Sequence, residues 1–276
     1  MSERPNSYVG VSGVVSHEQQ KHIEEYADSI GLLSSRQLAL GVKAVHKTQF
    51  LDIENKYGPE WYPVGREQFQ SALQPRTENS RSLAVAQTFF DPEYVSNPGY
   101  RNYFTDRIFE RGDDWIDCIQ FDMLPWHSDP EMLCFLTELK QKHDTKLFLQ
   151  VHKPAMEALG PKGVASHLNQ FADSIDYVLF DSSHGTGKRL DTDALKTYLG
   201  EAYASQALEH VGIALAGGLN GEIVAEELPK VLSEFRDVSW DAEGQLHPVS
   251  VNGSMPLDMQ RVEAYLSSST AVMSQN

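Results

Sequence analysis

The chain has 276 residues, of which 41% are hydrophobic and 10% aromatic, enough for one large domain or two small ones. Its 39 acidic residues against 23 Lys and Arg give a formal net charge of −16, which repels nucleic acid and anionic membranes over most of the surface. No apolar run approaches the ~20 residues of a membrane helix, and residues 1–6 lack the layout of a secretory signal. We therefore expect a soluble, cytoplasmic protein that binds neither nucleic acid nor membrane.

Eight apolar, strand-like runs alternate with amphipathic, helix-like stretches along the chain. The strand-like runs cover residues 8–15, 37–45, 82–88, 117–123, 146–151, 177–180, 211–216 and 238–240. This alternation is typical of parallel strands joined by crossover helices. Eight such units predict a single α/β domain, a (β/α)8 TIM barrel over residues 1–276.

Two segments depart from the alternation. Residues 50–79 follow the second strand and contain a cluster of Gly, Pro and aromatic residues at 58–63, which predicts an insertion made of a long loop and a short helix. Residues 267–276 are mostly small and polar, and we expect a frayed tail there.

Polar and small residues follow the strand-like runs, where the parallel strands of a barrel end. Such residues point into one shared mouth, which holds the active site in barrel enzymes. The residues expected to converge there are Ser12, Lys43, Asp122, His152, Asp181, Gly217 and Asp241. Among them, Asp122 and His152 are candidates for proton transfer, or for pairing with Lys43 or Lys153.

Two glycine-rich segments follow the sixth and seventh strands. The first segment contains Gly185, Thr186, Gly187 and Lys188, which offer backbone N–H groups, a hydroxyl and an ammonium. The second contains Gly217, Gly218 and Asn220, which offer backbone N–H groups and a side-chain amide. The second segment precedes a helix, and helix N-termini attract anions. Together with Lys43, these residues predict an anion site such as a phosphate site. A tight turn with Asn220 as the helix cap explains the second segment equally well.

Both glycine-rich segments resemble signatures of one enzyme family, the phosphoribosylanthranilate isomerases. DSSHGTGKRLD at 181–191 is similar to the family's sixth-strand signature, and LAGGLN at 215–220 is similar to its seventh-strand signature. Further segments stand where the family has related motifs, namely VSGV at 11–14, IQFD at 119–122 and GSMPLD at 253–258. The resemblance covers most of the chain and is most specific at strands six and seven.

The resemblance implies an eight-stranded barrel in which an acid and a base move protons along a phosphorylated aminosugar, in an Amadori rearrangement. Asp181 stands at the family's general-acid position, and Ser12 stands where the family has a catalytic cysteine. A serine hydroxyl is a poor base unless a neighbour takes its proton. The chain also has DAEG at 241–244 where the family has a Ser-Ser-Gly phosphate turn, and unpaired carboxylates beside a phosphate are unfavourable.

We therefore expect an intramolecular isomerase, a monomer or homodimer, that acts on a small anionic, sugar-like substrate without a metal or other cofactor. Three alternatives remain open. The first is a barrel that has lost this chemistry and serves as a ligand-binding or regulatory protein. The second is a lyase or aldolase that forms a Schiff base on Lys43 or Lys153. The third is a metal site with ligands from Asp122, His152, Asp181 and Asp241.

Overall fold

The computed structural model describes residues 4–74, 82–181, 190–248 and 256–275. Eight parallel strands pair in chain order, and the last pairs with the first to close a barrel. The strands are β1 (Tyr8–Ser12), β2 (Gln37–Val45), β3 (Ser82–Phe89), β4 (Cys118–Asp122), β5 (Lys146–His152), β6 (Tyr177–Asp181), β7 (Gly212–Ala216) and β8 (Ser239–Ala242). The predicted (β/α)8 fold is confirmed.

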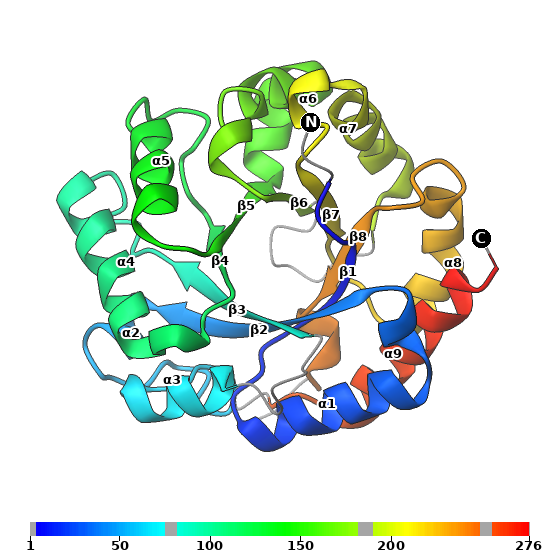
Figure 1. Cartoon of the computed structure of the whole chain (residues 1–276), viewed down its shortest axis with the longest axis horizontal. Coiled ribbons are helices and arrows are strands. Elements are labelled where there is room, and N and C mark those ends of the chain that lie inside the picture. The colour runs from blue at the N-terminus through cyan, green and yellow to red at the C-terminus, as the bar shows by residue number, and fades with distance from the viewer. Residues whose placement is uncertain (1–3, 75–81, 182–189, 249–255, 276) are drawn as a thin grey trace.

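Helices surround the outer side of the sheet (Figure 1). The α-helices are α1 (His17–Ser29), α2 (His46–Gln49), α3 (Gly65–Leu73), α4 (Pro98–Gly112), α5 (Met132–Lys142), α6 (Lys153–Leu168), α7 (Thr192–Ala204), α8 (Gly221–Leu232) and α9 (Met259–Met273). Short 3-10 helices cover Leu32–Ser34, Asp113–Trp115, Ala172–Ser174, Gln206–Leu208 and Gly244–Leu246. Within the described ranges, no helix combines the length and the apolar character needed to cross a bilayer.

Side chains alternate along each strand between the helices and the barrel interior. Outward residues such as Val9 and Leu40 are buried in the apolar core between sheet and helices. Inward residues at the N-terminal ends of the strands are mostly apolar, and the rings of Tyr8, Phe148 and Tyr177 lie 4.3 to 5.5 Å apart. These rings fill one end of the barrel. Inward positions at the other end are mainly polar, and that end carries the candidate site.

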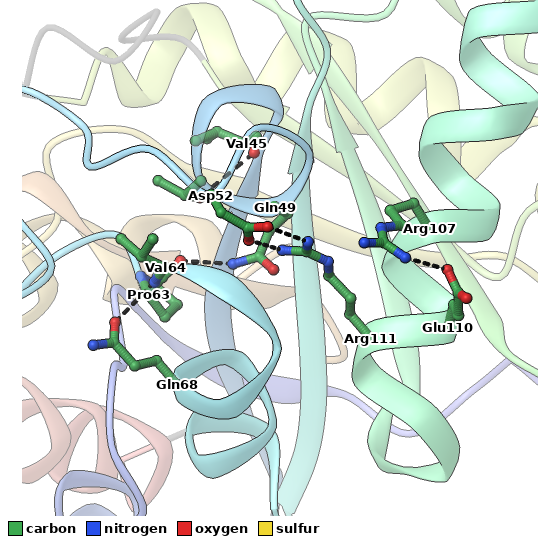
Figure 2. Close-up of polar contacts among 10 residues, drawn as sticks. Val45, Gln49, Asp52, Pro63, Val64, Gln68, Arg107, Glu110 and Arg111 are labelled. Atoms are coloured by element: carbon green, nitrogen blue, oxygen red, sulfur yellow. Dashed lines mark hydrogen bonds and ion pairs between the residues drawn. The ribbon is translucent and has the colours of Figure 1, made fainter.

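Polar contacts hold the segment between α2 and α3 against α4 (Figure 2). The Arg111 guanidinium donates to both carboxylate oxygens of Asp52 over 2.7 and 3.0 Å. The Gln49 side chain donates to the Pro63 carbonyl over 2.6 Å. The insertion predicted after the second strand is thus a loop anchored to the barrel wall and followed by α3.

The expectation of a frayed tail at 267–276 is wrong for most of that segment, because α9 continues to Met273. Ser269 is fully buried and accepts a hydrogen bond from the Trp240 indole over 3.0 Å. Val272 is also buried. Small side chains in this stretch let the helix lie close to the barrel, so their size reflects packing and not disorder.

Candidate active site

A cavity of about 390 Å³ lies at the C-terminal ends of the strands, within the range of about 300–1,000 Å³ typical of small-molecule sites. All eight strands contribute to its wall. In strand order, the contributing residues include Ser12, Lys43, Gln87, Asp122, Gln150, Asp181, Ala216 and Asp241. Loop residues complete the wall, among them Gly217, Gly218 and Glu243.

All of the residues expected to converge except His152 therefore line this cavity, and Asn220, a candidate for anion binding, does not line it. The chain turns into α6 directly after His152, whose buried ring lies 5.9 Å from the ring of His127 in the loop after β4. Asn220 is the N-cap of α8, and its side chain accepts a hydrogen bond from the Ile223 N–H over 2.9 Å. The predicted anion-binding residues Gly185, Thr186, Gly187 and Lys188 lie outside the described residues.

Ser12 has a carboxylate neighbour. Its hydroxyl donates to Asp241 with an Oγ–Oδ1 distance of 2.8 Å, and both side chains are buried. The Gln87 amide donates in turn to Ser12 Oγ over 2.5 Å. The serine hydroxyl is thereby oriented toward a group that can accept its proton, which the sequence alone did not identify.

From Gln87 the hydrogen bonds continue to the other side of the barrel. Gln87 donates to Gln120 over 3.5 Å, Gln120 donates to Gln150 over 3.2 Å, and Gln150 donates to Asp181 Oδ2 over 3.2 Å. All three glutamines are buried. The network therefore connects Asp241 to Asp181 and directs a donor at each carboxylate, which fixes the orientation of both.

Two glycines at inward positions make room for these polar side chains. A Cβ atom at Gly41 would lie 2.6 Å from Cδ of Gln87, and one at Gly10 would lie 2.7 Å from Cγ of Asp241. Both distances are shorter than real contacts of a Cβ atom. Glycine on one strand thus allows a long side chain from another strand to lie across the barrel interior.

We expect Gly41→Ala to lower the free energy of unfolding by about 1–3 kcal/mol, because the new methyl group displaces Gln87 from a packed interior. Urea unfolding measures this loss. Gly200→Ala is the matched control: it lies within α7, a Cβ there meets nothing within 4 Å, and alanine should stabilise the helix by up to about 1 kcal/mol. Equal effects of the two substitutions would contradict the proposed packing role of Gly41.

Two acids of the cavity have raised pKa values. Burial raises the pKa of Asp241 to about 7, and the Glu243 carboxylate also raises it. Removal from solvent raises the pKa of Asp122 to about 7, with Lys43 acting in the opposite direction and Glu243 and Asp181 adding to the rise. Groups that titrate near neutral pH both accept and release protons readily, which suits general acid–base catalysis.

Lys43 is buried and paired, whereas Lys153 lies elsewhere. The Lys43 ammonium is 2.5 Å from Glu243 Oε1. Burial disfavours its charged form, but the adjacent Glu243 carboxylate is among the groups that outweigh this effect and raise the pKa of Lys43. A firmly protonated amine is a poor nucleophile, so this environment does not favour Schiff-base chemistry. Lys153 is half exposed at the start of α6, pairs with Glu157 and does not line the cavity.

The insertion after β2 supplies an aromatic wall of the cavity, formed by Tyr57, Trp61 and Tyr62. Trp61 packs against His247, from the segment after β8, with ring centroids 4.4 Å apart. The Lys43 ammonium lies 5.6 Å from the Trp61 ring centroid and 5.8 Å from that of Tyr62. The position of the anchored loop thus determines the shape of one side of the site.

We expect Arg111→Ala to loosen this wall, because it removes both hydrogen bonds to Asp52 from a buried guanidinium. The free energy of unfolding should fall by about 1–2 kcal/mol, and limited proteolysis should cut faster within residues 50–64. Arg107→Ala is the matched control, since Arg107 lies one turn earlier on α4 and pairs with Glu110 at the surface (Figure 2). Cleavage of both variants at the wild-type rate would contradict the anchoring role of Arg111.

The loop after β7 places backbone atoms of two glycines at the wall of the cavity. Gly217 and Gly218 have φ values of 121° and 63°, in the region that glycine adopts most readily. Both line the cavity, and α8 begins at Gly221. The short turn and the capped helix expected from the sequence are therefore both present.

Sequence reasoning missed the buried glutamines Gln87, Gln120 and Gln150. A signal was present, because each interrupts an apolar strand at an inward position two or more residues before the strand ends.

The sequence also left open whether the acids of the cavity formed a metal site. In the parts of the chain that the structure describes, no group of three or more His, Cys, Asp or Glu residues is arranged to hold a metal ion.

Comparison with protein families gives one match. The family model described as N-(5'phosphoribosyl)anthranilate (PRA) isomerase matches residues 140–240, a range that runs from the end of α5 to the start of β8. None of the curated proteins matches the sequence. The resemblance found in the sequence is confirmed, and the chain is a divergent (β/α)8 barrel similar to this family.

Solved structures show the same fold at low sequence identity. A phosphoribosylanthranilate isomerase from Thermotoga maritima is 13% identical with a TM-score of 0.53, and the match covers 98% of each chain. A tryptophan synthase alpha chain from Legionella pneumophila is 15% identical with a TM-score of 0.57, over 98% of this chain and 92% of that one. A chain of the tryptophan synthase complex from Pyrococcus furiosus is 17% identical with a TM-score of 0.55, over the full length of both. At these identities the likeness concerns the fold.

Proposed function

We propose that this barrel, which is similar to the phosphoribosylanthranilate isomerases, is an intramolecular isomerase that converts a small sugar-like aldose or aldosylamine into the corresponding ketose. The observation that carries the proposal is the hydrogen-bond network between Asp241 and Asp181, which places two oriented carboxyl groups on one cavity. An isomerisation of this type needs one group that removes a proton from carbon and one that supplies a proton to oxygen.

Asp241 is the proposed base. With a pKa of about 7 it is roughly half ionised at neutral pH, and a carboxylate of that pKa accepts a proton more readily than an ordinary aspartate does. The Ser12 hydroxyl donates a hydrogen bond to the Asp241 carboxylate. Ser12 therefore orients the carboxylate or relays a proton to it. This arrangement supplies the proton acceptor that a serine at position 12 requires.

Asp181 is the proposed acid. It lies at the end of β6, accepts a hydrogen bond from Gln150 and lines the same cavity as Asp241. It also stands at the general-acid position of the family that the sequence resembles. Asp122, with its pKa of about 7, lines the same cavity from the end of β4 and is a second candidate for delivering a proton.

The proposed reaction balances without a co-reactant. Asp181 gives its proton to the ring oxygen of the substrate and opens the ring, and Asp241 takes the proton from carbon 2. The resulting enol gains a proton at carbon 1 and loses one from its hydroxyl group, which yields the ketose. Proton exchange with solvent returns Asp181 to the acid form and Asp241 to the carboxylate form.

Hydrogen exchange in D₂O tests the proposal. The purified protein is incubated with N-(5'-phosphoribosyl)anthranilate, with unphosphorylated aldoses and with amino sugars. Product formation is followed by fluorescence or NMR, and deuterium at carbon 1 of the product by NMR. Conversion above the spontaneous rate, with deuterium in the product, supports the isomerase. Absence of conversion across the panel contradicts it and favours a ligand-binding barrel without this chemistry.

A further inference from the structure

The row of hydrogen-bonded side chains around the cavity is interrupted at β2. Strands β3, β4 and β5 contribute Gln87, Gln120 and Gln150, each bonded to the next. At β2, between these strands and β1, the inward position is Gly41, which has no side chain to join the row. A Cβ atom there would lie 2.6 Å from Cδ and 2.8 Å from Oε1 of Gln87. The carbonyl end of Gln87 therefore occupies space that a side chain of β2 would otherwise fill.

The direction of the hydrogen bonds determines which end of the Gln87 amide is unpaired. Ser12 has one hydroxyl proton, and it donates this proton to a hydrogen bond with Asp241. Ser12 Oγ can then only accept from Gln87, whose Nε2 lies 2.5 Å away. This orientation leaves Gln87 Oε1 without a hydrogen-bond partner among the described residues. The carbonyl groups of Gln120 and Gln150, in contrast, each accept a hydrogen bond from the preceding glutamine.

The unpaired oxygen of Gln87 is buried at a cavity. Gln87 is 2% exposed and lines the cavity wall. A buried carbonyl group without a donor is unfavourable, so this position favours a ligand that brings an O–H or N–H group to it.

Gln87 is also close to the proposed base. Its amide bonds to the Ser12 hydroxyl, and Ser12 bonds to Asp241, so one hydroxyl group separates the amide from the carboxylate. In the proposed reaction Asp241 removes the proton from carbon 2 of the substrate. A hydroxyl group on that same carbon then lies within reach of the Gln87 side chain.

We propose that Gln87 Oε1 accepts a hydrogen bond from the hydroxyl group on carbon 2 of the substrate, so that Gln87 selects sugars in which this hydroxyl group is free. The inference rests on the proposed isomerase function, whose substrate recognition it specifies. The same hydroxyl group becomes the carbonyl group of the ketose. A neutral amide oxygen accepts hydrogen bonds and is a very weak base, so Gln87 orients the hydroxyl group and leaves the proton transfers to the carboxyl groups.

Calorimetry with sugars that differ only at carbon 2 tests this inference. The probes are D-ribose, 2-deoxy-D-ribose and 2-deoxy-2-fluoro-D-ribose, with the 5-phosphates of the same three sugars as a second series. Fluorine is similar in position to the hydroxyl oxygen but carries no hydrogen to donate. In at least one series we expect the parent sugar to bind about three- to tenfold more tightly than both analogues.

Three variants assign this preference to one atom. Gln87→Met removes the acceptor and should abolish the preference, whereas Gln87→Glu retains an acceptor of the same reach and should keep it. Gln120→Met is the matched control, since Gln120 is also a buried glutamine that lines the cavity, but its carbonyl group is already paired. It should keep the preference. Urea unfolding verifies that each variant is folded, and the three sugars on the wild-type protein give a test that needs no variant.

Four results would overturn the inference. They are binding of the fluoro sugar as tightly as the parent, binding of none of the six sugars, equal behaviour of Gln87→Met and Gln87→Glu, and loss of the preference in Gln120→Met. The test is separate from that of the isomerase. Conversion of a substrate without the preference would retain the isomerase and reject the role of Gln87. The preference without any conversion would reject the isomerase and retain Gln87 as a binding residue.

Discussion

The substitution Asp241→Asn will stabilise the folded protein above pH 7 while it removes most of the proposed activity. Burial raises the pKa of Asp241 from 3.8 to about 7, so the folded state binds this proton more tightly than the unfolded state does. Below about pH 4 both states are protonated and there is no penalty. Between pH 4 and 7 the penalty grows as the unfolded state ionises first, and above pH 7 it is constant.

That pKa difference corresponds to a destabilisation on the order of 4 kcal/mol above pH 7. Asparagine carries no charge and retains an oxygen that can accept the hydrogen bond from Ser12. We therefore expect Asp241→Asn to raise the free energy of unfolding by on the order of 2–4 kcal/mol at pH 8, and by much less near pH 4. Urea unfolding at the two pH values measures this, with Asp113→Asn as the exposed control. An equal effect at both pH values would show that ionisation of Asp241 is not its cause.

The second large effect concerns Asp181→Asn, which we expect to lower kcat of the isomerisation by about 10²–10⁴-fold. The amide keeps an oxygen that accepts the hydrogen bond from Gln150, but it has no proton of suitable pKa to give to the substrate. Ring opening then depends on solvent. Initial rates are measured on the substrate that the D₂O panel identifies.

Two controls separate catalysis from folding in this case. Asp181→Glu restores an acid and should recover part of the activity, and Asp181→Asn should still bind the substrate that the D₂O panel identifies. Retention of more than about a tenth of wild-type kcat by Asp181→Asn would remove this residue from the role of acid, and would leave Asp122 as the candidate.

The barrel was predictable because the sequence pattern that identifies each strand lies within a few consecutive residues. Each strand is a short run of branched apolar residues, and the predicted run at 37–45 coincides with β2. The run at 8–15 extends three residues beyond the observed end of β1, where Gly13 adopts a left-handed φ of 96° and ends the regular strand. The tail was wrongly predicted because small polar residues signal disorder in isolation, whereas here they pack α9 against the barrel.

The composition of the site was only partly predictable, because its key contacts join residues far apart in the chain. The alternation of strand-like and helix-like segments in the sequence was enough to place Ser12 and Asp241 at the ends of strands. Their hydrogen bond depends on closure of the sheet between β1 and β8. His152 ends β5 but is not among the residues that line the cavity, because position at a strand end does not determine where a side chain lies once the chain turns into a helix.

Closure of the sheet has a consequence for the order in which this protein is made. Ser12 is completed early in synthesis, but its partner Asp241 lies 229 residues later and reaches it only when the last strand docks beside the first. Contacts of such long sequence separation form late in folding. Nascent and partly folded chains therefore lack the hydrogen bond between Ser12 and Asp241, and in refolding experiments the return of activity should follow, and never precede, joining of the two ends of the sheet.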